Sequence, residues 1–271
     1  MERTAVLVLG HGSRRPRANQ EFELLVSRFR ARRPDLDVAH AYIELASPLL
    51  RHGLAQVAAR ADRVVVVPLF LFAAGHVKDD VPRALAAARL AFPSVRFEAA
   101  RPLGVHRAMV ELALSRARAA LGPDEGDAAE TVLLGVGRGA SDPDANGDLC
   151  KLVRLVGEAG KFAAAEPSFI AITRPFFPAA AERAALSRPR RVLVLPYFLF
   201  EGVLVEQLAA EVASYSARHP EIDVRLAKHL GVEERLLGLV EERLDELLRG
   251  GGGPQCDACP RLARAPGPVT P

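Results

Sequence analysis

The chain has 271 residues, of which 49% are hydrophobic and 25% are charged, with 21 Gly and 20 Pro. This composition excludes a disordered chain and collagen-like repeats, and the length suits one large domain or two smaller ones. The formal net charge of +3 lacks the basic excess typical of nucleic-acid-binding proteins, so we expect a small-molecule partner and no nucleic acid.

No segment approaches the roughly 18 uninterrupted apolar residues that a membrane-spanning helix needs, and the first residues lack the features of a signal peptide. The three cysteines, Cys150, Cys256 and Cys259, are too few and too unevenly spaced for a disulfide framework. We therefore expect a cytoplasmic protein that does not contact membranes.

Short apolar runs rich in β-branched residues alternate along the chain with stretches of helical spacing. The expected strands cover residues 5–9, 38–43, 64–67, 132–134, 169–172 and 192–195. The expected helices cover residues 18–32, 48–60, 79–91, 105–121, 144–157 and 202–218. Runs without polar alternation indicate strands buried on both faces, and their alternation with helices predicts an α/β fold with parallel sheets flanked by helices. Ligands of such sheets bind at the carboxyl ends of the strands.

The two halves of the chain resemble each other. Residues 10–19, GHGSRRPRAN, align with residues 137–146, GRGASDPDAN, and residues 67–72 align with residues 195–200. A polar stretch with Gly and Pro at residues 122–130 separates the halves. We therefore predict two similar lobes from an internal duplication, with domains at 1–124 and 130–249 and a flexible tail at 250–271 that carries Cys-x-x-Cys. Because fusion supplies a second lobe internally, we expect a monomer.

Two histidines follow predicted strands of the first half. His11 stands between two glycines, whose backbone freedom allows a tight turn that presents the imidazole at the strand end. His76 follows Gly75 after an apolar stretch. Neutral imidazoles bind metals and accept protons, so the pair can converge on one metal or one proton. The alternative for the first loop is a phosphate-binding glycine turn, and for His76 an ordinary helix start.

The second half supplies an internal comparison. Arg138 replaces His11 and Val203 replaces His76 in the alignment. Because both imidazoles are lost together, a shared site is favoured over two independent packing roles. Between the two histidines, Glu44 follows the second expected strand, where its carboxylate can assist proton removal or orient a histidine. An exposed helix-start glutamate is the alternative.

These motifs together resemble the class II sirohydrochlorin chelatases in their long, two-lobed CbiX/SirB form, over about residues 4–248. The resemblance rests on His-Gly-Ser-Arg at 11–14 with Asn19, Pro-Leu-Phe-Leu at 68–71 with Gly75-His76, and Gly-Arg-Gly at 137–139 with the Pro-Tyr-Phe-Leu-Phe run at 196–200. It implies a lyase that inserts Co²⁺ or Fe²⁺ into sirohydrochlorin in cobalamin or sirohaem biosynthesis, with the metal as substrate and no further cofactor.

The resemblance also implies roles for individual residues. His11 and His76 bind the metal, and His11 and Glu44 are the catalytic residues, with His11 as proton acceptor. The macrocycle is contacted by the stretch Leu71, Phe72, Ala73, Ala74, Gly75 and His76. From the residues themselves, we expect arginines near the cleft, Arg14 and Arg138 among them, to bind the peripheral carboxylates of the substrate.

Two other functions remain open at this point. A phosphohydrolase or mutase would use His11 as a phosphate acceptor, and a carrier would bind metal or tetrapyrrole without turnover.

Overall fold

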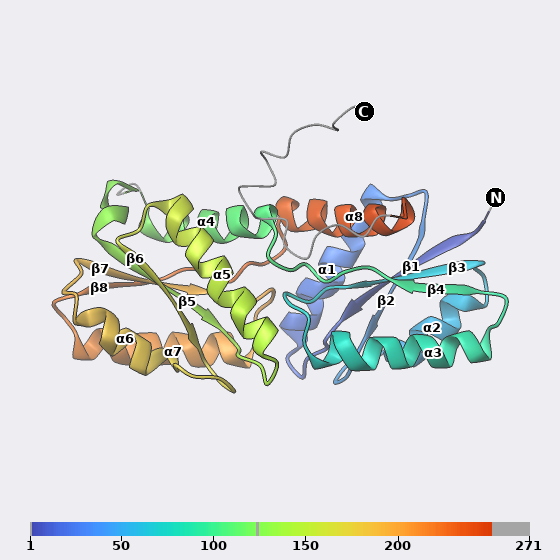
Figure 1. Cartoon of the computed structure of the whole chain (residues 1–271), viewed down its shortest axis with the longest axis horizontal. Coiled ribbons are helices and arrows are strands. Elements are labelled where there is room, and N and C mark those ends of the chain that lie inside the picture. The colour runs from blue at the N-terminus through green and yellow to red at the C-terminus, as the bar shows by residue number, and fades with distance from the viewer. Residues whose placement is uncertain (1, 123–124, 251–271) are drawn as a thin grey trace, which may run out of the picture.

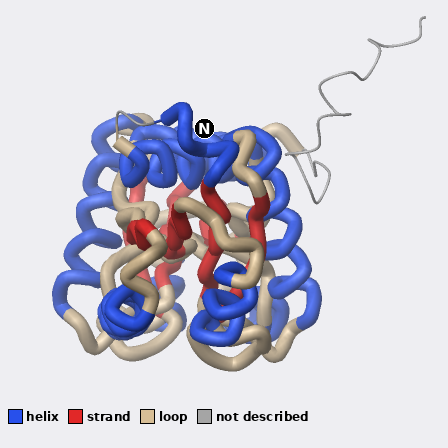
Figure 2. Tube along the Cα trace, turned by 90° about the vertical axis from the view of Figure 1, so that its left-hand side faces the viewer, coloured by secondary structure: helices blue, strands red, loops and turns tan. Residues whose placement is uncertain are grey.

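The computed structural model describes residues 2–122 and 125–250, apart from the side chains of His76 and of residues 125–127. Most of the expected tail, residues 251–271, therefore lies outside the described residues. Two four-stranded parallel sheets form two lobes, with strand orders β2-β1-β3-β4 and β6-β5-β7-β8. Helices cover both faces of each sheet (Figures 1 and 2). The predicted α/β fold with two similar lobes is confirmed.

The first half contains four strands, four α-helices and one π-helical turn. They are β1 (Thr4–Gly10), α1 (Pro16–Arg32), β2 (Asp37–Tyr42), α2 (Leu50–Ala58), β3 (Arg63–Pro68), η1 (His76–Asp80), α3 (Val81–Ala91), β4 (Arg96–Ala99) and α4 (Arg107–Leu121). The central strands β1 and β3 are buried almost throughout, as their uninterrupted apolar runs predict. Helix α1 begins with Pro16 and buries Phe22, Leu25, Val26 and Phe29, which lie on one face at helical spacing.

The second half repeats this order after a 3₁₀ turn, η2 (Glu125–Glu130). Its elements are β5 (Thr131–Gly137), α5 (Pro143–Gly160), β6 (Ala164–Phe169), α6 (Phe177–Ala185), β7 (Arg191–Pro196), α7 (Val203–Arg218), β8 (Asp223–Leu226) and α8 (Glu234–Leu248). The strand expected at residues 169–172 is misplaced, because β6 ends at Phe169. Strand β6 lies at the edge of its sheet and contains Pro167, which an edge strand tolerates. Because of this proline, β6 does not appear as an apolar run in the sequence.

The last helix of each half packs on the other half. Helix α4 lies against β7 and α5 of the second lobe, and α8 lies against β3 and α1 of the first (Figure 1). In this exchange of helices between the halves, two arginines at matching positions bind backbone carbonyls of the other half. Arg116 of α4 donates to the carbonyl of Leu230 at 3.1 Å, and Arg243 of α8 donates to that of Leu103 at 2.8 Å. The domain bounds 1–124 and 130–249 stay a prediction, which describes the repeat in the sequence. In the structure, the last helix of each half packs on the other half.

The exchanged helices close one apolar core that runs through both lobes. It contains residues of α1, α4, α5 and α8 together with the sheet faces beneath them. Separate clusters lie under α2 and α3 on the first sheet and under α6 and α7 on the second. The apolar core is therefore continuous between the inner faces of the two sheets, and the carboxyl ends of β1, β3, β5 and β7 lie at a common cleft.

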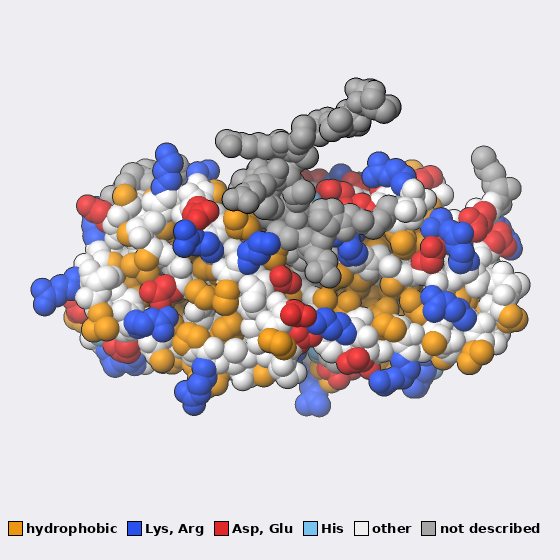
Figure 3. Space-filling view, viewed as in Figure 1, with side chains coloured by type: hydrophobic (Ala, Val, Ile, Leu, Met, Phe, Trp, Pro, Cys, Tyr) orange, Lys and Arg blue, Asp and Glu red, His pale blue; other side chains and the backbone are white. Residues whose placement is uncertain are grey.

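Charges on the surface are mixed. Lys and Arg side chains alternate with Asp and Glu over the coloured part of the face in Figure 3, without a continuous basic patch there. None of the helices in the described residues is long and apolar enough to cross a bilayer.

Candidate active site

A cavity of about 360 Å³ lies between the lobes, at the carboxyl ends of the strands. Matching segments of the two halves line it: residues 10–13 after β1 and 137–140 after β5, then residues 69–72 after β3 and 197–201 after β7. The first turns of α1 and α5 add Ala18, Asn19, Ala145 and Asn146 to the lining. The duplication therefore builds a cleft with two similar walls, at the strand ends where the parallel sheets predict it.

His11 is held in a defined orientation by its own loop. Its Nδ1 lies 3.1 Å from the carbonyl oxygen of Gly12. A carbonyl only accepts hydrogen bonds, so Nδ1 donates and Nε2 is left as the basic nitrogen. The side-chain amide of Asn19 donates to the carbonyl of Ser13 at 2.8 Å and ties the loop to α1. The imidazole is about one-third exposed and faces Phe70, with ring centroids 6.5 Å apart.

Glu44 lies beside His11. Its Oε1 is 3.5 Å from Nε2 of His11, and its backbone N–H donates to the carbonyl of His11 at 3.0 Å. Gly12 has a φ of +91°, and a Cβ there would lie only 1.8 Å from the carbonyl oxygen of Glu44. The glycine after His11 is therefore required for the close approach of the two loops, which brings an imidazole and a carboxylate together.

The third loop forms an apolar wall. Leu71, Phe72 and Ala74 line the cavity with Leu69 and Phe70. The other predicted residues Arg14, Glu44, Ala73 and Gly75 are not among the lining residues. His76 is the first residue of η1, and its side chain lies outside the described part of the structure. Among the described residues no three His, Cys, Asp or Glu side chains form a metal-binding group. Nε2 of His11 and Oε1 of Glu44 lie side by side, and the metal-binding roles of His11 and His76 stay predictions.

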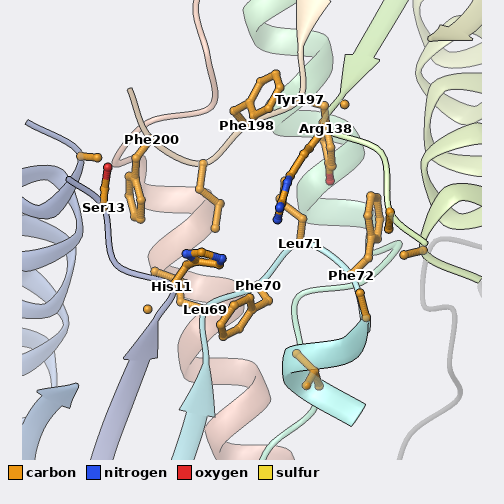
Figure 4. A pocket seen from close by; sticks show the side chains of 18 of the residues that line it. His11, Ser13, Leu69, Phe70, Leu71, Phe72, Arg138, Tyr197, Phe198 and Phe200 are labelled. Atoms are coloured by element: carbon orange, nitrogen blue, oxygen red, sulfur yellow. The ribbon is translucent and has the colours of Figure 1, made fainter. Parts of the chain in front are cut away.

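The second lobe provides the opposite wall. Arg138 extends into the space between His11 and Leu71, with Phe198 and Phe200 on the same side of the cavity (Figure 4). Within the described residues no carboxylate pairs with Arg138. Its guanidinium is therefore available to an anionic ligand.

Several residues of this wall were not predicted as site residues. Tyr197 stacks on Phe72 of the first lobe with ring centroids 5.6 Å apart, and its buried hydroxyl has no hydrogen-bond partner. Burial raises the pKa of this phenol far above its usual range, so it stays protonated. The alignment of residues 195–200 with the apolar stretch 67–72 of the first half is the sequence feature that could have predicted this second wall.

Other basic residues near the cleft are paired between the lobes. Lys78 of η1 lies 2.6 Å from Asp142 and 2.9 Å from Asp144, at the start of α5. Arg15 lies 3.0 Å from Glu206 of α7. These ion pairs join the lobes at the edge of the cleft. Lys78 and Arg15 thus pair with carboxylates of the second lobe.

The second lobe repeats the loop framework of the first without the imidazole and the carboxylate. Ala171 donates its backbone N–H to the carbonyl of Arg138 at 3.1 Å, as Glu44 does to His11. The position of Glu44 is thus occupied by alanine, in addition to the replacement of His11 by Arg138. The imidazole and the carboxylate are therefore both absent from the matching loops of the second lobe.

Comparison with known sequences identifies the family. A sequence profile described as CbiX matches residues 5–120 and again residues 132–247. The chain belongs to the CbiX family. The two matches coincide with the two halves of the duplication, and both contain the loops that line the cavity.

Individual relatives agree with this assignment. The chain is 35% identical over 256 residues to a protein of Priestia megaterium named sirohydrochlorin cobaltochelatase, covering 94% of this chain and 83% of the relative. It is 29% identical to the sirohydrochlorin ferrochelatase of the same organism, covering 92% of each chain. The structure of SirB from Bacillus subtilis with Fe³⁺ superposes with a TM-score of 0.79 at 26% identity, covering 90% of this chain and 95% of that one.

Proposed function

We propose that this CbiX-family chain inserts a divalent metal, Co²⁺ or Fe²⁺, into sirohydrochlorin, in cobalamin or sirohaem biosynthesis. The observation that carries the proposal is the cleft between two apolar walls, which His11 lines from one side with the carboxylate of Glu44 3.5 Å from its imidazole. Two apolar walls suit the two faces of a flat tetrapyrrole, whose peripheral side chains would extend beyond the cavity, and a metal delivered from one side can reach its central nitrogens. The names of the relatives support the same reaction.

The His11–Glu44 pair suits a metal on its way to the macrocycle. Metal–nitrogen and metal–oxygen bonds of about 2.1 Å at a tetrahedral angle place the two ligand atoms about 3.4 Å apart. The observed separation of Nε2 and Oε1 is 3.5 Å. Both atoms can therefore bind one ion without rearrangement. His76, at the start of η1, is proposed as the third ligand.

The same two groups can receive the protons of the reaction. Metal insertion replaces two pyrrole N–H protons by one divalent ion, so two bases must accept them. As the metal leaves His11 and Glu44 for the macrocycle nitrogens, the imidazole nitrogen and the carboxylate each regain a lone pair. Each then takes up one proton and releases it to water, which restores the site.

The walls account for binding of the organic substrate. Leu71 and Phe72 of the first lobe and Phe198 and Phe200 of the second all line the cavity, and their side chains offer apolar surface to a macrocycle. Arg138 extends into the cavity, where a charge-assisted hydrogen bond to a peripheral carboxylate orients the ring. A phosphohydrolase is less well supported, because the Glu44 carboxylate next to His11 would repel a phosphate.

The proposal includes a monomer that works in the cytoplasm. The two walls of the cleft come from one chain, so no second copy is needed to complete it.

Absorbance spectra of sirohydrochlorin with Co²⁺, recorded with and without the protein, test this function. A chelatase accelerates the change to the metallated spectrum over the metal-only control, and His11→Ala removes the acceleration while the circular dichroism spectrum stays unchanged. A carrier shifts the tetrapyrrole spectrum by binding without faster metallation, and a phosphohydrolase does neither. Either of the last two results refutes the proposal.

A further inference from the structure

The residue after Glu44 has an unusual backbone conformation. The N–H of Ala46 donates to the carbonyl of Glu44 at 2.8 Å, which closes a three-residue turn with Leu45 at its centre. Leu45 has a φ of 63°. A turn of this kind with positive φ at its central residue is the strained form of the γ-turn, and leucine rarely adopts such a φ. The side chain of Leu45 is half-exposed, so burial of the leucine does not account for the strain.

The turn holds Glu44 by both of its backbone polar groups. Its N–H donates to the carbonyl of His11, and its carbonyl accepts from Ala46. The same carbonyl lies directly against Gly12, where a Cβ would be 1.8 Å away. The Cα of Glu44 is therefore fixed relative to the loop that carries His11.

The second lobe shows what the loop does without the carboxylate. Ile172 occupies the position of Leu45 and is not among the described residues with positive φ. No γ-turn hydrogen bond from Thr173 to Ala171 occurs among the described backbone contacts. Instead, the hydroxyl of Thr173 donates to the carbonyl of Ala140 at 2.7 Å, and the nitrogen of Thr173 lies 2.9 Å from where a Cβ of residue 139 would be. The strained turn is thus present only in the lobe that carries the imidazole–carboxylate pair.

We infer that Leu45 is a positioning residue, whose left-handed backbone holds the carboxylate of Glu44 at His11. This inference rests on the proposed function for the identity of the metal site, but its physical content is the geometry of the Glu44 loop. Backbone strain at a functional site persists only when the surrounding structure enforces it. Here the enforcing contacts are the bonds to His11 and Ala46 and the close approach to Gly12.

Leu45→Ile tests the inference, because a β-branched side chain opposes positive φ more strongly than leucine does and reproduces the residue of the second lobe. We expect the affinity for Co²⁺ alone, measured by titration without tetrapyrrole, to fall about tenfold, as for other groups that orient a metal ligand. The kcat for metallation falls with it, while the KM for sirohydrochlorin is unchanged. Leu45→Asn, which tolerates positive φ, retains the Co²⁺ affinity.

Two further variants make the test specific. Ile172→Leu is the matched control in the second lobe and leaves Co²⁺ affinity and metallation unchanged. In a Glu44→Gln background, Leu45→Ile causes no further loss, because Leu45 acts through the carboxylate. If Leu45→Ile fails to fold, Ala46→Pro, which removes the donor of the turn, takes its place with the same expected loss.

Wild-type Co²⁺ affinity in Leu45→Ile, an equal loss in Leu45→Asn, or an additive loss in the Glu44→Gln background overturns the inference. The Co²⁺ titration does not depend on turnover. A wild-type chain that binds Co²⁺ but does not metallate sirohydrochlorin therefore refutes the proposed function and leaves the role of Leu45 to be decided by the same variants.

Discussion

Gly12→Ala is the substitution for which the structure defines the consequence most directly. A Cβ at Gly12 would lie 1.8 Å from the carbonyl oxygen of Glu44 and 3.3 Å from the nitrogen of Ala46. Real Cβ contacts essentially never fall below 3.0 Å, and the obstructing atom belongs to the backbone. The Glu44 loop must therefore move by roughly 1 Å away from His11 to admit a single methyl group.

Gly139→Ala is the matched variant in the second lobe. Gly139 has a φ of +84°, close to the +91° of Gly12, and its Cβ would lie 2.9 Å from the nitrogen of Thr173. Both alanines carry a backbone cost of about 1–2 kcal/mol for positive φ. Only Gly12→Ala also displaces Glu44, which is proposed to bind the metal, and a misplacement of about 1 Å lowers a rate about 100-fold.

The two variants are compared by urea denaturation and by the initial rate of Co²⁺ insertion into sirohydrochlorin. We expect both to lose about 1–2 kcal/mol of unfolding free energy from φ alone, with Gly12→Ala losing more because its loop is displaced. The kcat/KM of Gly12→Ala falls about 100-fold, and that of Gly139→Ala falls far less. Equal losses of activity, or an active Gly12→Ala variant, would show that the approach of the Glu44 loop to His11 does not serve the reaction.

Two further outcomes concern residues at and away from the cleft. Arg138→Ala raises the KM for sirohydrochlorin about 10- to 100-fold, which corresponds to the loss of one charge-assisted hydrogen bond. The affinity for Co²⁺, measured by direct titration, stays unchanged. A fall in Co²⁺ affinity would contradict a role of Arg138 in carboxylate binding. His219 lies 3.1 Å from Glu182 and 3.2 Å from Glu221, and these carboxylates raise its pKa above the usual value of 6.5. A raised folded-state pKa stabilises the protein fully below pH 6.5, and this stabilisation is lost as the pH rises through the folded-state pKa. We therefore expect the difference in unfolding free energy between wild type and His219→Gln, measured by urea denaturation, to be larger at pH 5.5 than at pH 9. A difference that does not change with pH would contradict this.

The repeat and the fold class were predictable from local patterns. Continuous apolar runs mark strands buried on both faces, and residues 64–67 and 192–195 fall within β3 and β7. Short edge strands such as β4 and β8 carry polar residues and were not predicted. The helices α6 and α8 were also missed, although α8 buries a full apolar face that includes Leu236, Leu237, Leu239, Val240 and Leu244.

The exchange of α4 and α8 lies beyond what a local pattern contains. An amphipathic helix shows that it has an apolar face, but the pattern does not say which sheet the face covers. The partners of Arg116 and Arg243 are backbone carbonyls more than 100 residues away in sequence. Backbone carbonyls exist at every residue, so the two contacts leave no recognisable pairing in the sequence.

The candidate site was predictable where chemistry and glycine coincide. His11 between two glycines drew attention because only glycine permits the turn, and the structure shows that Gly12 admits the carbonyl of Glu44. The separation of His11 from Glu44 was not predictable, because it depends on the register of β1 and β2, which pairs Gly10 with Tyr42. Parallel neighbours in register place the residues that follow each strand side by side.

The differences between the two lobes separate what the cleft needs from what the reaction needs. Gly12 and Gly139, and Asn19 and Asn146, are retained in both lobes, and each asparagine ties its loop by a bond to the backbone. The glycine and asparagine of each loop shape one wall of the cleft, and a macrocycle held between two walls needs both walls. A metal enters a planar ring from one face, so a second ligand set opposite the first would compete for the ion and hold it away from the macrocycle. Under the proposed function, the arginine and alanine at the positions of His11 and Glu44 avoid that competition, and Arg138 gives the second wall a group that can bind an anion.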